Sequence, residues 1–217
     1  MKKTILVLFV TVLSVATVSA QGLNLGVRAG FNASNITGFP KIDLGDLAKA
    51  SNNYKPGFQV GVVAQYMTTA SFGFETGLYY SMLGTDYKVT AGSVVSEKIT
   101  MNPSYLQLPI TALYKFNVGT DLDLYPQAGV YLGYGLGGKI KDGNESVNFF
   151  GKINDEEEEI ANRFDAGLTL GLNLQYSKFV IGLGYDLGLL KINKEALGEG
   201  FNDLNNRNIK VTLGYFF

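Results

Sequence analysis

The stretch RFDAGLTLGLNLQY, from Arg163 to Tyr176, alternates apolar and polar side chains along its length. From Phe164 onward every second residue is apolar, and the residues between them are small or polar. A period of two predicts a β-strand with two unlike faces. If the leucines point inward, the protein is a soluble β-sandwich or ligand-binding barrel. If they point outward, they must contact lipid.

The composition excludes several classes of chemistry. The 217 residues include 27 glycines and 13 tyrosines, but no cysteine and no histidine. A chain without these two residues has no disulfide, no thiolate chemistry and no histidine general base, and it lacks the usual zinc ligands. The formal charge of -1 gives no basic footprint for nucleic acid. We therefore expect no metal, no cofactor and no nucleic-acid partner.

The N-terminus has the pattern of a secretory signal peptide. Lys2 and Lys3 precede the apolar run ILVLFVTVLSVA, and the small residues Val18 to Ala20 follow it. This pattern predicts a signal peptide over residues 1–20, cleaved after Ala20, and an exported domain over residues 21–217. A membrane anchor is the alternative, but the run is shorter than the roughly 20 residues that a spanning helix needs. No later segment has that apolar length, so a membrane-spanning mature chain must be a closed barrel.

Eight segments alternate like the first one, and each is long enough to cross a bilayer at a tilt. Their connections alternate between short ones, such as TTAS, VGTD and SK, and long ones. This order predicts an all-β fold, an eight-stranded antiparallel up-and-down transmembrane β-barrel with short periplasmic turns and long extracellular loops. The segments are Leu23 to Asn32, Phe58 to Met67, Phe72 to Leu83, Tyr105 to Asn117, Leu122 to Gly135, Phe164 to Tyr176, Phe179 to Leu189 and Asn208 to Phe217.

Aromatic residues of the apolar face gather at the strand ends beside the short turns, where they would form one periplasmic girdle. Aromatics that merely favour strands would be scattered along them, so this placement favours leucines that face lipid. The outer end has fewer candidates, namely Phe31, Phe58, Tyr134 and Phe164. The girdle residues are Tyr66, Phe72, Phe74, Tyr114, Phe116, Tyr176, Phe179, Tyr215 and Phe217.

The opposite face would then line a narrow lumen, and it contains seven charges that we expect to pair with one another, since an unpaired buried charge is costly. Counting from the turns puts four of them in the periplasmic half, namely Arg28, Glu75, Lys115 and Asp123. The other three, Asp165, Asp186 and Lys210, fall in the outer half, where Lys210 is expected to pair with both carboxylates. Tyr79, Tyr125 and Tyr131 are expected to fill the remaining space. The seven residues are Arg28, Glu75, Lys115, Asp123, Asp165, Asp186 and Lys210.

Three other segments allow a functional and a plain reading. The five acids from Asp155 to Glu159 could bind a divalent cation or a basic partner, but their spacing lacks that of a calcium loop, which favours a solvated loop. The first long loop could contain a short helix, capped by Asp43 or Asp46 and ending at Lys49, as a lid or as plain surface. The glycines of GLGGKIKDG, residues 135–143, lack the spacing of a phosphate-binding loop. Catalysis by Asp165 and Asp186 is less expected than a structural pair, so we predict no catalytic residues.

The C-terminal strand NIKVTLGYFF ends on an aromatic residue with no polar tail. Its apolar stripe, Val211, Leu213, Tyr215 and Phe217, resembles the C-terminal signal that the outer-membrane barrel-assembly machinery recognises in its clients. An ordinary last strand is the alternative.

Three stretches resemble the PorT-like outer-membrane β-barrel family: SYLQLPITALYKF (Ser104 to Phe116), the opening stretch, and GLGYDLGLLKI (Gly182 to Ile192). The resemblance covers residues 21–217. It implies an eight-stranded barrel in the outer membrane of a Gram-negative bacterium, and it implies no activity. Such proteins are often named porins, and one member is linked to a secretion system, but no functional residues carry over.

The sequence thus predicts a non-enzymatic outer-membrane barrel with a filled lumen and outer loops that serve surface interaction or envelope integrity. Outer-membrane lipid, lipopolysaccharide and, during biogenesis, the barrel-assembly machinery are its expected partners, and the partner of the loops is not specified. One alternative is a soluble exported barrel, similar to a lipocalin, that binds a small apolar ligand. The other is a membrane enzyme acting on lipids, which the absence of histidine disfavours.

Overall fold

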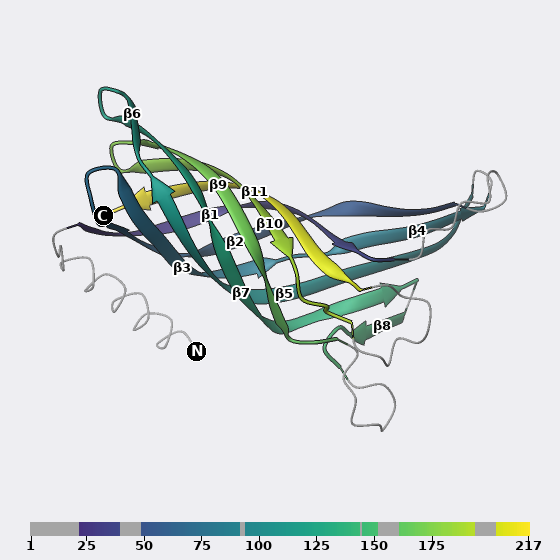
Figure 1. The fold of residues 1–217 in the computed structure, drawn as a ribbon. Coiled ribbons are helices and arrows are strands. Elements are labelled where there is room, and N and C mark those ends of the chain that lie inside the picture. The colour runs from purple at the N-terminus through teal and green to yellow at the C-terminus, as the bar shows by residue number, and fades with distance from the viewer. Residues whose placement is uncertain (1–21, 40–48, 92–93, 144, 152–160, 194–202) are drawn as a thin grey trace, which may run out of the picture.

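The computed structural model describes residues 22–39, 49–91, 94–143, 145–151, 161–193 and 203–217, and these form one antiparallel sheet. Eight of its strands pair in chain order, and the last pairs back with the first to close a ring (Figure 1). The predicted eight-stranded antiparallel barrel is therefore confirmed. Its ring strands are β1 (Leu23–Thr37), β2 (Lys49–Met67), β3 (Phe72–Met82), β5 (Val94–Tyr114), β7 (Leu122–Asp142), β9 (Phe164–Tyr176), β10 (Phe179–Gly188) and β11 (Asn205–Phe216).

The leucines of β9 face outward. Leu168, Leu170 and Leu172 are 46%, 57% and 45% exposed, whereas Thr169 and Asn173 between and beside them are each 3% exposed. The other ring strands show the same alternation of exposed apolar and buried polar side chains. A fold with its apolar face outside and its polar face inside is built for lipid as its solvent. The soluble lipocalin-like alternative is not supported.

The nine residues of the girdle lie at the short-turn end of the barrel. Eight are exposed and Tyr215 is half-buried, and register pairs such as Phe72 with Tyr114 and Phe179 with Tyr176 join them across neighbouring strands. The outer aromatics pair likewise, Phe31 with Phe58 and Tyr134 with Phe164. The twelve residue steps from Phe164 to Tyr176, at about 3.3 Å each on a tilted strand, rise roughly 30 Å, which is the thickness of a bilayer core.

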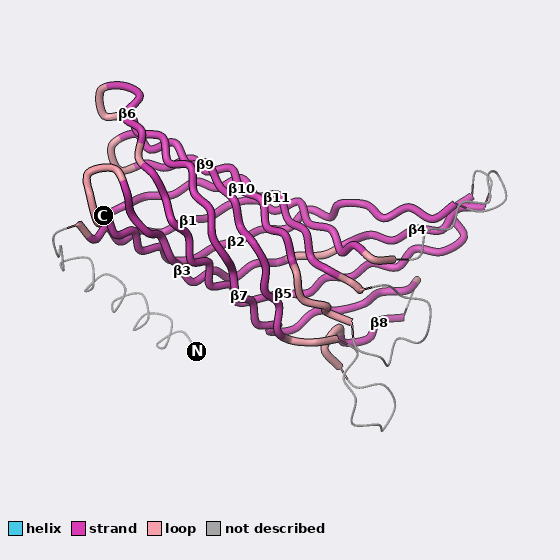
Figure 2. Tube along the Cα trace, viewed as in Figure 1, coloured by secondary structure: helices cyan, strands magenta, loops and turns pink. Residues whose placement is uncertain are grey.

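Several strands continue beyond the outer aromatics, where the sequence predicted loops. β2 begins at Lys49 instead of Phe58, β5 begins at Val94 instead of Tyr105, and β4 (Thr85–Ala91) pairs with both of them. β8 (Glu145–Asn148) pairs with the end of β7, and at the other end β6 (Phe116–Gly119) continues β5. Figure 2 shows the extended strands projecting from the end opposite the short turns. The alternation continues there with its faces reversed, because the outward face meets water: Tyr87, Met101 and Ile140 pack inward, and the polar residues between them face outward. The prediction missed these parts because it rested on an apolar outward face.

The inner face also changes character in this extension. Eleven buried apolar residues form one cluster at the long-connection end, here called the outer plug. Phe150 packs edge-on against Tyr105, and Arg163 donates hydrogen bonds to the carbonyls of Phe150 and Gly135 at 3.2 Å each. A Cβ atom on Gly135 would overlap the Phe150 ring, which gives this glycine a packing role. The plug comprises Ile36, Phe39, Leu83, Tyr87, Met101, Tyr105, Phe149, Phe150, Ala161, Ile192 and Leu204.

Some predicted features lie outside the described residues: the signal peptide over residues 1–20, most of the possible short helix before Lys49, and the acidic run from Asp155 to Glu159. Lys49 itself begins β2. Within the part of the chain that the structure describes, no helix is long and apolar enough to cross a membrane.

An arginine on the lipid face tests the orientation of β9. Leu170→Arg should lower the free energy of unfolding by about 2–4 kcal/mol, because a charge near the bilayer midplane must be desolvated. The measurement is urea unfolding of protein folded into lipid vesicles. Ala70→Arg, at an exposed position in the short turn between β2 and β3, is the matched control and should change stability by less than about 0.5 kcal/mol. Equal, small effects of the two substitutions would contradict the orientation.

Candidate functional site

The lumen contains a buried ion pair between β1 and β3. The Arg28 guanidinium donates to both Glu75 oxygens, at 2.9 and 3.0 Å, and the two residues are 6% and 5% exposed. Gly61 of β2 lies in register between Arg28 and Tyr79. A Cβ atom on Gly61 would overlap the Tyr79 ring, so this glycine leaves room for Tyr79 beside the ion pair. The bidentate arrangement of Arg28 and Glu75, with two parallel N–H···O hydrogen bonds, is the strongest geometry for an arginine–carboxylate pair.

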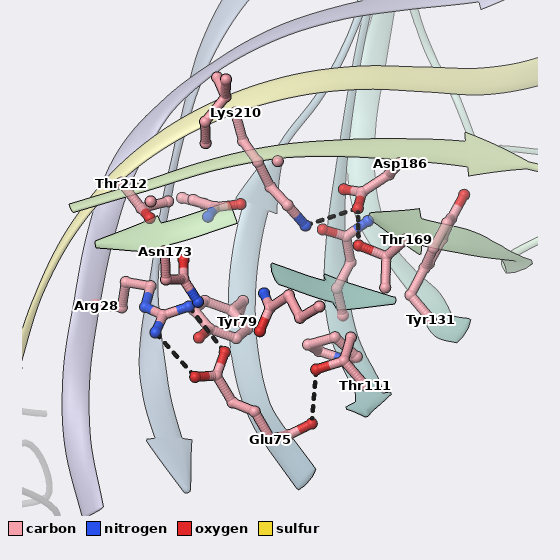
Figure 3. Close-up of a pocket in the computed structure, with 17 residues that line it drawn as sticks. Arg28, Glu75, Tyr79, Thr111, Tyr131, Thr169, Asn173, Asp186, Lys210 and Thr212 are labelled. Carbon is pink, nitrogen blue, oxygen red and sulfur yellow. Dashed lines mark hydrogen bonds and ion pairs between the residues drawn. The ribbon is translucent and has the colours of Figure 1, made fainter. Parts of the chain in front are cut away.

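A second pair links β11 to β10 in the same part of the lumen. Lys210 Nζ lies 2.6 Å from Asp186 Oδ1, and the Thr169 hydroxyl donates to the same oxygen at 2.7 Å. Asn208 donates to the other oxygen at 3.3 Å. Figure 3 shows both pairs pointing into one space, with Tyr79 and Tyr131 beside them. The carboxylate of Asp186 is thus fully engaged by its neighbours.

Asp165 does not pair with Lys210, so that part of the prediction is wrong. Its carboxylate accepts hydrogen bonds from Asn206 at 2.8 Å and from the Tyr131 hydroxyl at 3.1 Å. Asp186 lies in register with Thr169, four residues along β9 from Asp165, which is about 13 Å of extended chain. Asp165 is therefore nearer the outer plug, out of reach of Lys210.

Lys115 and Asp123 form a separate pair at the short-turn rim. Their charged groups are 2.7 Å apart, and their side chains are 32% and 15% exposed. The predicted grouping of four inner and three outer charges is therefore wrong. Arg28 and Glu75 share their cavity with Asp186 and Lys210 instead.

The two buried pairs line a cavity of about 40 Å³, which has room for a few water molecules at most. Toward the short turns Val63, Val180 and Phe216 pack with Tyr79, and toward the other end lies the outer plug. Tyr79, Tyr125 and Tyr131, the expected lumen fillers, are all buried. Sequence reasoning missed further lining residues whose strand parity could have identified them: Gln59, Gln107, Thr111, Asn173 and Thr212.

The charged groups of the lumen contact one another and neutral neighbours. The described residues contain no group of three or more acidic, cysteine or histidine side chains that could hold a metal ion. Asp165 and Asp186 each accept hydrogen bonds from their own neutral neighbours, and Asp186 has its own cation. The charges of the lumen therefore join strands of the ring, some of them not adjacent to one another.

Removing one member of the central pair tests its structural weight. Glu75→Gln should lower the free energy of unfolding by about 3–5 kcal/mol, because Arg28 is left buried without a counter-charge. The double variant Arg28→Gln, Glu75→Gln should lose less than the two single variants combined. Asp203→Asn is the control, since Asp203 pairs with Lys191 at 57% and 62% side-chain exposure, and should cost at most about 1 kcal/mol. Losses that simply add would show that the two groups are not coupled.

The chain is similar to several outer-membrane proteins of known structure and matches one family model. Ail of Yersinia pestis is 16% identical, with a TM-score of 0.45, over 91% of this chain and 100% of that one. OprG of Pseudomonas aeruginosa is 16% identical (TM-score 0.47, 90% and 96%), and the outer membrane enzyme PagL is 11% identical (TM-score 0.45, 88% and 98%). Among the curated proteins none matches the chain. The family described as "Outer membrane protein beta-barrel domain" matches residues 19–194, so the chain belongs to that family and is an integral β-barrel of the outer membrane.

Proposed function

We propose that this protein is a non-enzymatic outer-membrane barrel that acts through its cell-surface end, in surface interaction or envelope integrity, and not by conducting solutes. The observation that carries the proposal is the filling of the lumen. The outer plug packs eleven buried apolar residues at the long-connection end, and two buried ion pairs occupy the middle. An interior of this kind leaves the extended strands as the part available for contacts.

The size of the barrel supports a closed interior. Eight strands enclose just enough space for side chains to fill, and the cavity around the ion pairs measures about 40 Å³. The lack of histidine in the sequence, together with carboxylates already engaged by their neighbours, supports a role without catalysis. An assignment as a porin or as a PorT-like protein has less support, because it rests only on the resemblance of strand patterns such as Gly182 to Ile192.

Solute flux tests the proposal. Proteoliposomes that contain the folded protein should not swell in arabinose faster than empty liposomes, because the lumen offers no continuous water path. Folding is checked separately by gel mobility in SDS, where a compact barrel should shift on boiling. Rapid swelling by a heat-modifiable sample would contradict a closed lumen. A sample without any shift would contradict an integral barrel.

The export and assembly signals belong to the same proposal. Residues 1–20 would direct export and be removed after Ala20, which N-terminal sequencing of the mature protein tests. The C-terminal stripe of Val211, Leu213, Tyr215 and Phe217 would be read by the barrel-assembly machinery. It lies on the strand that closes the ring, where the Phe217 amide donates to the Leu25 carbonyl at 2.9 Å.

Substitution of the last residue separates recognition from stability. Phe217→Ser should reduce the amount of folded protein in the outer membrane of cells while leaving refolding of the purified chain in detergent unchanged. The control is Phe116→Ser, a girdle residue that is similarly exposed, 49% against 42%, but lies outside the C-terminal strand. Equal losses for both variants in cells would show that Phe217 acts only as a girdle residue.

A further inference from the structure

Five lysines share the outward face of the extended strands, and a sixth, Lys55, reaches it through its ion pair with Asp86. They come from four neighbouring strands, and the pairing register puts them side by side. Lys88 is the cross-strand partner of Lys98, and Thr100 has Asp86 as its partner on one side and Lys141 on the other. The alternate residues Tyr87, Met101 and Ile140 pack on the other side of the same strands, in or against the outer plug. The six residues, here called the lysine face, are Lys49 and Lys55 of β2, Lys88 of β4, Lys98 of β5, and Lys139 and Lys141 of β7.

The positive charge of this face is largely unneutralised. Among the described residues, the acidic side chain on this face is Asp86. Its carboxylate oxygens lie 3.6 Å from Lys55 Nζ and 3.4 Å from Lys98 Nζ. Burial alone would raise the pKa of Asp86, but a hydrogen bond from Thr100 and the two lysine charges outweigh it and hold that pKa below its usual value. In the described part of the chain the other four lysines have no ion pair. Six cations against one anion leave a strong surplus.

Because of the strand register, this surplus of positive charge destabilises the protein when no anion is bound. Lys88 and Lys98 are direct cross-strand partners, and like charges in that position destabilise a sheet. An anionic ligand that lies over the face would remove the repulsion. The charge pattern therefore indicates an anion with several negative groups spread over neighbouring strands.

The position of the face identifies the anion. It lies above the lipid-facing wall: Lys55 is three residues beyond Phe58 on β2, and Lys139 is five residues beyond Tyr134 on β7, past a register shift. Along tilted strands these steps raise the two lysines roughly 7–12 Å above the outer aromatics, and lysine side chains can bend back toward the interface. The remaining lysines stand higher, where a large phosphorylated sugar headgroup extends from the membrane.

We infer that the lysine face binds the phosphate groups of lipopolysaccharide in the outer leaflet. The inference rests on the proposed function, because only an outer-membrane barrel brings this face above that leaflet. The phosphates would bridge lysines of adjacent strands and so hold the extended sheet against the headgroup layer.

Native mass spectrometry of the folded protein in nonionic detergent, titrated with rough lipopolysaccharide, tests the inference. The triple variant Lys88→Gln, Lys139→Gln, Lys141→Gln should bind at least about tenfold more weakly, since each lysine near an anionic surface contributes to affinity. The same lipopolysaccharide after removal of its phosphates should bind wild-type protein as weakly. High salt should reduce the phosphate-dependent part.

The matched control removes three exposed cations from other walls: Lys178→Gln, Lys191→Gln, Arg207→Gln. It has the same net charge as the test variant and should bind within about twofold of wild type. Equal losses in the two variants, an unchanged test variant, equal binding of dephosphorylated lipopolysaccharide, or no binding by wild type would each overturn the inference. All three proteins should remain heat-modifiable. A wild-type sample that is not heat-modifiable contradicts the proposed function instead.

Discussion

The pairing of β1 with β11 is the constraint on which the structure depends. In a bilayer every backbone N–H and C=O group must find a partner within the protein, so a sheet can span lipid only if it has no free edge. The register from Gly26–Phe216 to Thr37–Asn205 supplies that closure over the full length of β11. With eight strands the circumference is fixed, and the interior can hold side chains but no wide channel.

The same strands contact lipid in one part and water in another, and the polarity of their outward side chains changes between the two parts. Between the girdle and the outer aromatics the outward face is apolar and the lumen contains ion pairs and amides. Beyond Phe58 and Tyr134 the same strands have lysines outside and the outer plug inside. The barrel thus resembles a membrane protein at one end and a water-soluble sheet at the other. This reversal closes the lumen and creates the charged surface together.

The sequence was informative where lipid imposes a strict pattern. The alternation from Phe164 to Tyr176, the short turns and the C-terminal stripe predicted the number and direction of the ring strands. The alternation did not identify β4 or the first parts of β2 and β5, because beyond the lipid it is reversed, with polar residues such as Lys88 outside and apolar residues such as Tyr87 inside. Likewise, the face of each strand that carries the charges could be assigned, but not which charges share a cavity, nor the partner of Asp165.

The outer plug and the lysine face were beyond reach for another reason. Phe149 and Phe150 follow β8, and their contact with Gly135 and Tyr105 depends on how a long connection folds back. Lys88 and Lys141 become neighbours only through the register of β4, β5 and β7. Such contacts are set by strand pairing across distant parts of the chain, which local periodicity does not encode.

Spin labels attached to single introduced cysteines test the reversal of polarity most directly, since the chain has no cysteine of its own. The protein is reconstituted in lipid, and collision of each label with oxygen and with a water-soluble nickel complex is measured. A label at Leu170 should be accessible to oxygen and protected from nickel, and a label at Lys141 should show the opposite. A label at Leu170 that is protected from both would mean that the leucines form a core, which would contradict the account.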